Sequence, residues 1–261
     1  MNIIVCLKQV PGITEVKIDP NTNTLIRQGI KNIINPLDCY ALEEAVRLKE
    51  RYTGKVTAIS MGPPQAIDML REAISLGADD AVLLSDREFA GADTLATSYT
   101  LAKAIDRYGQ YDLVICGRQT LDGDTGQVGP EIAETLGVPF VAYVSKIDEV
   151  ANGHMLLKRM IEEGHEVIET PLPAVITVTK EINTPRLPSL RGIAKSKSAA
   201  VPVWTTAEIG IDKSMVGLAG SATKVVKVFF PKRERRGEVL KGELDAQVDC
   251  LVGKLKGGGL I

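Results

Sequence analysis

A glycine-rich loop between an apolar run and a helix-forming stretch contains the residues with the clearest capacity for binding chemistry. Residues 111–115 are typical of a buried parallel strand, and residues 131–136 have helical spacing. Glycine lets a backbone approach a ligand closely, and free N–H groups at a helix start attract anions. Thr125 and Gln127 add side-chain donors. The candidate binding residues here are Cys116, Gly117, Asp122, Gly123, Asp124, Thr125, Gly126, Gln127, Val128, Gly129 and Pro130.

The glycine pattern of this loop matches neither the dinucleotide-binding motif GxGxxG nor the phosphate-binding motif GxxxxGK[ST], so the loop alone does not identify a ligand site. The elements around it provide the further evidence. The sequence predicts strands over 2–7, 55–60, 81–84 and 112–116, alternating with helices that start near Asn35, Pro64 and Asp93. Such alternation predicts an α/β fold, a Rossmann-like parallel sheet flanked by helices. The loops at Asn35, Met61, 89–94 and 117–130 then share the carboxyl edge of the sheet, where such folds bind ligands. We therefore expect a nucleotide site at this edge.

The composition argues against several other classes of protein. The chain has 261 residues, 44% of them hydrophobic, and a net charge of -2. That charge predicts no nucleic-acid or membrane-surface partner, and the apolar runs are strand-sized. No secretory signal is recognisable, so we expect a cytoplasmic protein with free, buried thiols at cysteines 6, 39, 116 and 250. Two histidines, His154 and His165, make a histidine-based metal site or catalytic triad improbable.

The second half of the chain has a different pattern. A hairpin excursion is predicted over 16–26, and a β-meander over 144–150, 155–161 and 166–170 precedes a strand at 174–179. Helical periodicity is weak from 180 to about 232, which is typical of a linker or of an arm ordered by a partner. An apolar cluster favours the arm, and its members are Val225, Val226, Val228, Phe229 and Phe230. A last helix is predicted over 243–255, with an apolar stripe that packs on its own core or on another subunit.

Taken together, these residues resemble the β subunit of electron-transfer flavoproteins along nearly the whole chain. The matching segments are Lys8, 35–36, 44–50, 60–63, 77–79, 117–130, 172–175 and 185–197. The resemblance implies a heterodimer with an α subunit that carries FAD. It implies a nucleotide-binding α/β domain over 1–200 and a C-terminal arm and helix over 201–261 that packs on the α subunit. It places nucleotide contacts at Cys6, Asn35, Asp38, Met61, Gly62 and the loop 122–130.

The family contains two types that differ in the nucleotide of the β subunit. The mitochondrial type holds AMP, and the electron-bifurcating type holds a second FAD that NADH reduces. The stretch 91–98, with Asp93, Thr94 and Thr97, resembles the bifurcating type, as does 122–131. Asp93 is equally suited to capping its helix, and the two roles are compatible.

The resemblance therefore implies a β subunit whose FAD takes hydride from NADH. One electron would go to ferredoxin or flavodoxin, and the other, through the α-subunit FAD, to an acyl-CoA dehydrogenase. The alternatives are a non-bifurcating carrier with structural AMP, an ATP-using adenylating enzyme of similar fold, and a purely structural subunit. The adenylating enzyme is disfavoured, because Lys8-Gln9-Val10-Pro11 stands where a glycine-rich phosphate loop would follow the first strand.

The segment 185–197 resembles the family's recognition loop, which docks on the acyl-CoA dehydrogenase. The residues implied in this contact are Leu187, Leu190, Ile193 and Lys195, with Leu190 as the anchor. An exposed leucine between Pro188 and Gly192 can enter a pocket of the partner. The opposing interpretation is that Leu190 packs on its own subunit, as most leucines do.

Overall fold

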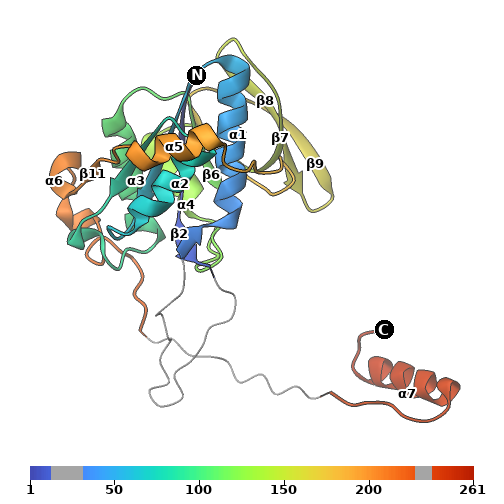
Figure 1. Cartoon of the computed structure of the whole chain (residues 1–261). Helices are drawn as coiled ribbons and strands as arrows, with labels where there is room; N and C mark the ends of the chain where they lie inside the picture. The colour runs from blue at the N-terminus through green and yellow to red at the C-terminus, as the bar shows by residue number, and fades with distance from the viewer. Residues whose placement is uncertain (13–31, 227–236) are drawn as a thin grey trace. The chain divides into compact units, whose positions relative to one another are not determined.

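The computed structural model describes residues 1–12, 32–226 and 237–261, which form two units, Met1–Lys224 and Val225–Ile261 (Figure 1). The hairpin predicted over 16–26 lies outside the described residues, as do Val228, Phe229 and Phe230. The first unit continues past the boundary expected at residue 200, because residues 203–204 add a strand to its sheet. Among the described residues, no helix has the length and apolar character needed to span a membrane.

A nine-stranded, mostly parallel sheet is the centre of the first unit, as the sequence predicted. Its strand order is β11-β5-β4-β1-β6-β10-β7-β8-β9. Five parallel strands are mostly buried apolar runs, with bounds β1 Asn2–Cys6, β4 Lys55–Met61, β5 Asp80–Leu84, β6 Leu113–Gly117 and β10 Ala174–Val178; the short parallel strand β11 Val203–Trp204 is more exposed. The predicted meander is confirmed as the antiparallel set β7 Phe140–Ala151, β8 His154–Ile161 and β9 Gly164–Pro171.

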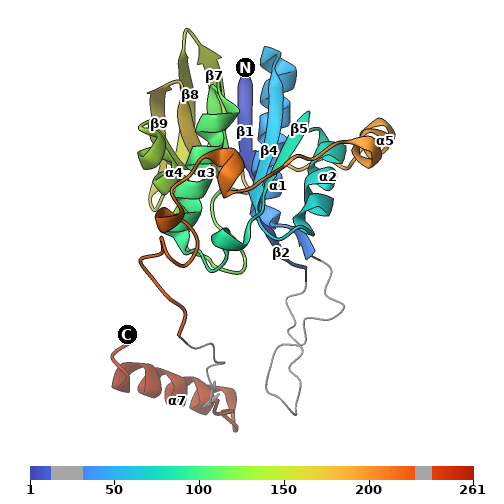
Figure 2. The same cartoon turned by 90° about the vertical axis from the view of Figure 1, so that its left-hand side faces the viewer.

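Helices cover both faces of this sheet (Figure 2). Alternate residues of β1 point to opposite faces, so Ile3 and Val5 pack in one core and Ile4 and Cys6 in the other. The first core is covered by α1 and α2, the second by α3 and α4. Their bounds are α1 Pro36–Tyr52, α2 Ala66–Leu76, α3 Thr94–Tyr108 and α4 Val128–Leu136. A two-stranded ribbon, β2 Gln9–Pro11 and β3 Asn32–Ile34, lies between β1 and α1 in the sequence.

The segment after β10 is more structured than the sequence indicated. It contains α5 Leu190–Ser198, β11, α6 Thr206–Ile209 and the 3-10 helix η2 Lys213–Met215. β11, α6 and η2 are two to four residues long, too short for periodicity to reveal them, and α5 has nine residues but buries only Ser196, so it lacks a buried apolar face. Long-range contacts hold them instead, since the Asp86 carboxylate accepts hydrogen bonds from the backbone N–H and hydroxyl of Thr206 at 3.0 and 2.8 Å.

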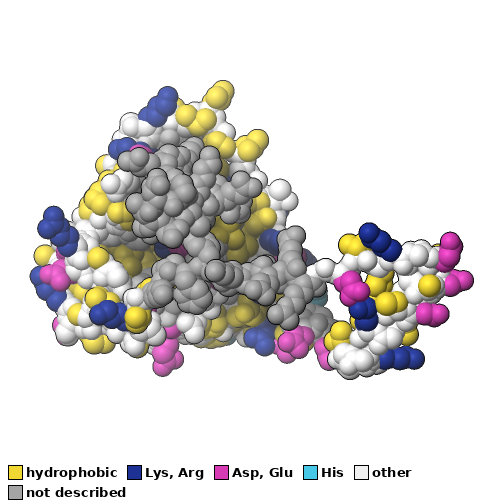
Figure 3. All heavy atoms as spheres, turned by 90° about the horizontal axis from the view of Figure 1, so that it is seen from below, with side chains coloured by type: hydrophobic (Ala, Val, Ile, Leu, Met, Phe, Trp, Pro, Cys, Tyr) yellow, Lys and Arg dark blue, Asp and Glu magenta, His cyan; other side chains and the backbone are white. Residues whose placement is uncertain are grey.

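The second unit contains the predicted C-terminal helix, α7 Leu244–Gly257. None of its residues is buried within the described chain. Leu244, Val248 and Leu251 are 73%, 50% and 49% exposed. In Figure 3, hydrophobic side chains lie among acidic and basic ones on this helix. The helix therefore carries an apolar stripe with no cover in its own unit.

Candidate functional site

The carboxyl edge of the parallel strands brings together the predicted binding segments. Parallel pairing places the ends of β4, β1 and β6 side by side, with Ile59 opposite Cys6 and Cys6 opposite Cys116. Figure 3 views the first unit from this edge, where hydrophobic side chains lie beside charged ones. The loops that follow these strands therefore form one surface.

Asn35 and Asp38 join the end of β1 to the loop after β6. The Asp38 carboxylate accepts hydrogen bonds from the Lys8 backbone N–H at 2.7 Å and the Asn35 side-chain amide at 2.9 Å. The same amide donates to the Gln119 carbonyl at 2.9 Å, and the Asn35 side-chain oxygen accepts from the Leu121 N–H at 3.2 Å. Two polar side chains at the start of α1 thus fix the positions of two binding segments.

Asp38 is buried in this arrangement, only 4% exposed. Burial raises its pKa from 3.8 to about 7, against the opposing effect of hydrogen bonds from Asn35, Lys8 and Gly117. A Cβ at Gly117 would lie 2.3 Å from Asp38 Oδ1, so only glycine fits at the end of β6. The Asp38 carboxyl is therefore a titratable group inside the site with an ionisation close to neutral pH.

The loop between β6 and α4 is open to solvent throughout residues 121–127. Asp124 and Gly126 have φ of 54° and 65°, so the chain turns through left-handed conformations here. Within the described residues, the N–H groups of residues 125–127 donate to no protein acceptor. They lie directly before the N-terminus of α4 and so form a suitable contact for an anion.

The acidic side chains of this loop are already paired. Lys8 Nζ lies 3.6 Å from the Asp122 carboxylate, and the Gln119 amide donates to the Asp124 carboxylate. These contacts reduce the repulsion that two carboxylates would exert on a bound phosphate. The charge of the loop is therefore compatible with an anionic ligand.

The start of α3 is joined to the same loop. Thr94 Oγ1 donates to Glu131 Oε1 at 3.1 Å and lies 3.4 Å from Gln127 Oε1. Thr97, one turn into α3, is half-buried beside this start. Thr94 therefore lies between the starts of two helices, and its contact with a ligand stays a prediction.

Asp93 caps α3, and both of its carboxylate oxygens are occupied. One accepts from the Ala96 N–H at 3.1 Å, the other from the N–H and hydroxyl of Thr223 at 2.8 and 3.1 Å. Burial raises its pKa, but these hydrogen bonds outweigh that effect and lower it below the ordinary value. Contact between Asp93 and a ligand stays a prediction, whereas its role in holding the segment 221–223 is visible.

Five other predicted residues have visible packing roles, and their contact with a ligand stays a prediction. A Cβ at Gly129 would lie 2.5 Å from Thr177 Cγ2, so this glycine allows α4 to pack on β10. Cys6 and Cys116 are buried free thiols on neighbouring strands. A hydrogen bond with Cys6 and burial raise the pKa of Cys116 well above its usual range. Val128 and Pro130 belong to the first turn of α4.

Met61 and Gly62 line a hollow of about 560 Å³ beyond the ends of β4 and β5. Pro63, Phe89 and Arg87 are among its other walls, so one cation faces a mainly apolar surface. This volume lies within the range of pockets that take small organic ligands, roughly 300–1,000 Å³. The predicted residues of β4 are thus next to a space of suitable size.

Sequence reasoning missed three parts of this edge. The Arg118 guanidinium stacks over the Tyr143 ring at 4.9 Å, and Tyr143 has a φ of 58° in a bulged part of β7. Ser221 and Thr223 reach Asp93 across about 130 residues of sequence. The paired strand ends could have indicated Arg118, but no local signal predicts the other contacts.

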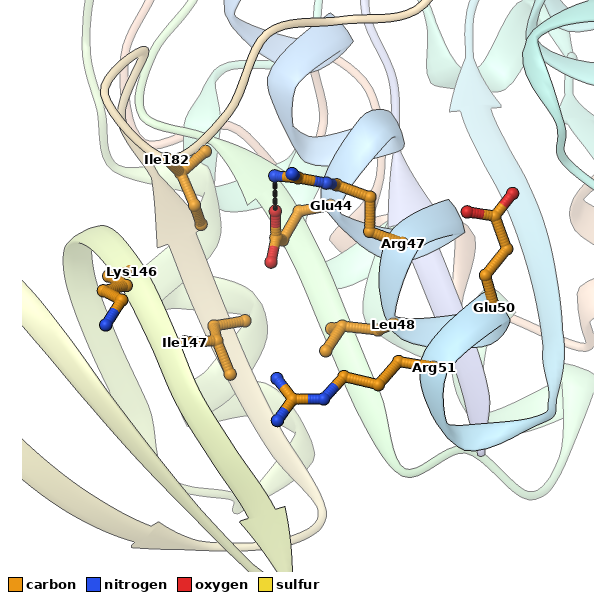
Figure 4. Close-up of a pocket in the computed structure, with 8 residues that line it drawn as sticks. All are labelled: Glu44, Arg47, Leu48, Glu50, Arg51, Lys146, Ile147 and Ile182. Atoms are coloured by element: carbon orange, nitrogen blue, oxygen red, sulfur yellow. Dashed lines mark ion pairs between the residues drawn. The ribbon is translucent and has the colours of Figure 1, made fainter.

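A second hollow, of about 580 Å³, lies between α1 and β7 (Figure 4). Its walls include Arg47, Arg51 and Lys146 with Leu48 and Ile147. Arg47 is paired with Glu44 at 3.7 Å. None of the predicted cofactor residues lines it. In the described part of the chain, no three His, Cys, Asp or Glu side chains are grouped so that they could hold a metal ion.

Comparison with known proteins agrees with the resemblance seen in the sequence. Residues 22–209 match the family model of the electron transfer flavoprotein domain. The chain is 51% identical over 256 residues to the electron transfer flavoprotein subunit beta of Thermoanaerobacterium thermosaccharolyticum, with 98% of each chain covered. It is 46% identical over 258 residues to the caffeyl-CoA reductase-Etf complex subunit CarD of Acetobacterium woodii, again with 98% coverage of both.

A third relative is the protein FixA of Azotobacter vinelandii, which is 45% identical over 248 residues, covering 92% of this chain and 88% of that one. Family model and relatives thus agree over nearly the full length. This chain belongs to the electron transfer flavoprotein family, among its β subunits.

Proposed function

We propose that this chain is the β subunit of an electron-bifurcating electron transfer flavoprotein and that it binds FAD at the carboxyl edge of its sheet. The observation that carries the proposal is the junction of three binding segments at this edge. Asn35 joins the end of β1 to the loop 118–127, and Thr94 joins that loop to the start of α3. A dinucleotide needs such an extended, continuous surface, with donors for phosphates and space for a ring system.

The residues present fit a flavin dinucleotide. The unpaired N–H groups at residues 125–127 would hold the pyrophosphate, while the hollow beside Met61 and Phe89 would accept a planar ring. The Lys8 ammonium offsets the charge of Asp122, and the Gln119 amide holds the Asp124 carboxylate by a hydrogen bond. The chain's own task is to bind, orient and exclude water.

When bound, the FAD would accept hydride from NADH and supply one electron to ferredoxin or flavodoxin and one, through the α-subunit FAD, to an acyl-CoA dehydrogenase. The relative named for a caffeyl-CoA reductase-Etf complex supports a partner that acts on CoA thioesters. The exposed leucines of the segment 185–197 would provide the contact with this partner.

The second candidate is a non-bifurcating carrier that holds AMP at the same edge. The anion contact at residues 125–127 suits the phosphate of either nucleotide, whereas the junction through Thr94 favours the longer ligand. Family membership leaves the adenylating-enzyme alternative without support.

The identity of the released nucleotides separates the two candidates. We expect the purified αβ complex to release two FAD and no AMP on denaturation, measured by chromatography against nucleotide standards. One FAD and one AMP per heterodimer would contradict bifurcation while keeping the family assignment. Reduction of the complex by NADH, followed through the flavin absorbance, would test the electron donor separately.

A further inference from the structure

Two leucines project from a short stretch of chain that is fixed at both ends. Leu187 and Leu190 are 89% and 88% exposed, so Leu190 does not pack on its own subunit here. Ser189 between them caps α5, because its Oγ accepts the Gly192 N–H at 3.0 Å. Large exposed apolar side chains held in a defined shape are typical of a protein contact.

Arg186, the residue before Leu187, fixes one end of this stretch to α1. Its guanidinium donates to both oxygens of Glu43 at 2.8 and 3.1 Å and to both oxygens of Glu50 at 2.6 and 3.0 Å. Its backbone N–H also donates to Glu43 at 3.1 Å. Glu43 and Glu50 are two turns apart on one face of α1, a spacing that a planar guanidinium can bridge.

The Arg47 guanidinium lies 3.8 Å from the Glu43 carboxylate, and in the described residues no side chain of α1 forms an ion pair with Glu50. Figure 4 shows Arg47 meeting Glu44, while Glu50 extends from the other side of the helix than Arg51. A hydrogen bond from Arg186 lowers the pKa of Glu50, so Glu50 stays ionised at neutral pH. Arg186 and its two carboxylates therefore form a persistent clamp.

The other end of the stretch is fixed on α2. A Cβ at Gly192 would lie 2.2 Å from the Ser75 carbonyl oxygen, so α5 approaches the end of α2 at backbone distance. Lys195 Nζ donates to the carbonyls of Ala78 and Asp79 at 3.3 and 3.0 Å. The backbone that carries the two leucines is thus fixed at both ends, which restricts the motion of the segment.

We propose that Arg186 is a positioning residue for partner docking, whose clamp on Glu43 and Glu50 holds Leu187 and Leu190 ready to enter an apolar pocket of the partner. The inference rests on the proposed function, in which this segment contacts an acyl-CoA dehydrogenase. Residues 182–203 contain no Asp or Glu, and two of their four cations, Arg191 and Lys197, have no carboxylate partner among the described residues, so we expect an acidic rim on the partner's pocket.

The clamp acts on binding more than on folding. The pair with Glu50 is exposed and contributes little to global stability, whereas Glu43 is only 7% exposed and keeps the backbone N–H of residue 186 as a donor when the guanidinium is removed. A released segment would have to be ordered again on each encounter, and that ordering reduces affinity. Loss of the clamp therefore weakens docking while the fold persists.

The test uses the αβ complex with Arg186→Gln, and Arg51→Gln on α1 as the matched control. We expect Arg186→Gln to speed hydrogen exchange at the Gly192 and Ile193 amides, which bond to Ser189. We expect it to weaken dehydrogenase binding about tenfold, or about 1.4 kcal/mol, with unchanged nucleotide content and a melting temperature lowered by about 2–4 °C, because Glu43 loses a buried partner. Arg51→Gln should change neither the exchange nor the affinity. Unchanged exchange or unchanged affinity in Arg186→Gln would overturn the inference.

A double-mutant cycle separates positioning from direct contact. In a Glu43→Gln/Glu50→Gln background, Arg186→Gln should weaken binding by less than about twofold, because the clamp is already lost. A tenfold loss in that background would show that Arg186 touches the partner itself. If the unmodified complex binds no dehydrogenase, the proposed function fails, and the exchange experiment still decides whether Arg186 orders the segment.

Discussion

At the scale of the residue, Asp38 combines hydrogen bonds that favour its charged form with burial that favours its neutral form. It accepts hydrogen bonds from Lys8 and Asn35, which favour its charge, yet it is buried, and burial raises its pKa to about 7. A carboxyl with a raised pKa binds more protons in the folded than in the unfolded protein. Its contribution to the free energy of unfolding is therefore complete below about pH 4 and is lost as the pH rises through about 7.

Replacing Asp38 isolates this contribution. The difference in unfolding free energy between the natural chain and Asp38→Asn should decrease as the pH rises from about 4 to about 7, and then stay level. Asparagine cannot titrate, and its amide would face the donor of Lys8 or Asn35. Denaturant unfolding at several pH values measures the difference. A constant difference over this range would show that Asp38 ionises normally.

Gly126 offers a test of the phosphate contact with a control for strain. Gly126 and Gly137 have nearly the same φ, 65° and 66°, but Gly137 follows α4 and has open space around it. Alanine at either position should cost about 1–2 kcal/mol of backbone strain. Only Gly126→Ala should also lower nucleotide occupancy of the β site, measured after denaturation of the αβ complex. Equal occupancy in the two variants would place the phosphates elsewhere.

The residues of the site differ in how well the sequence reveals them. Gly117, Asn35 and the loop 122–130 stand at strand ends, so the alternation of strands and helices is enough to bring them together. Tyr143 and Thr223 reach the edge through a bulge and through a contact over a long sequence distance. Such contacts depend on tertiary packing and produce no periodic pattern in the amino-acid sequence.

At the scale of the element, α5 determines what Leu190 can do. Because this helix lies on α2 with Gly192 against Ser75, the leucine at its first position points away from the core and is almost fully exposed. Leu190→Ala should weaken dehydrogenase binding by more than tenfold, the typical effect of removing about 2 kcal/mol of hot-spot contact.

The melting temperature of Leu190→Ala should stay unchanged, because the side chain covers no core residue. Val167→Ala is a suitable control, since Val167 is 60% exposed on the distant strand β9. It should alter neither binding nor stability. Early melting of Leu190→Ala with full affinity would assign Leu190 to the core.

The elements also show where periodicity fails as a guide. Helices α1 to α4 bury an apolar face, and the strands β1, β4, β5, β6 and β10 are buried apolar runs, so apolar spacing predicts them. Strand β11 has two residues and α6 has four, and both depend on partners such as Leu83 and Asp86. The first unit as the structure divides the chain ends at Lys224 and so includes these two elements.

At the scale of the whole molecule, the division after Lys224 predicts two separable tasks. A chain ending at residue 224 keeps the described sheet and its two cores, so its melting temperature should fall by less than about 3 °C. It should lose the α subunit during copurification, because the exposed stripe of α7 is the expected contact. Retention of the α subunit by the shortened chain would assign the heterodimer interface to the first unit.

The two margins of the nine-stranded sheet have a consequence for self-association. One margin is β11, which is two residues long and offers almost no ladder to an incoming strand. The other is β9, where Glu166 and Glu169 are exposed and Pro171 ends the strand. Short length, like charge and proline each discourage a strand of another molecule from joining the sheet. The two edge strands of this large sheet are thus poor templates for pairing with another molecule, which disfavours aggregation through the sheet edges.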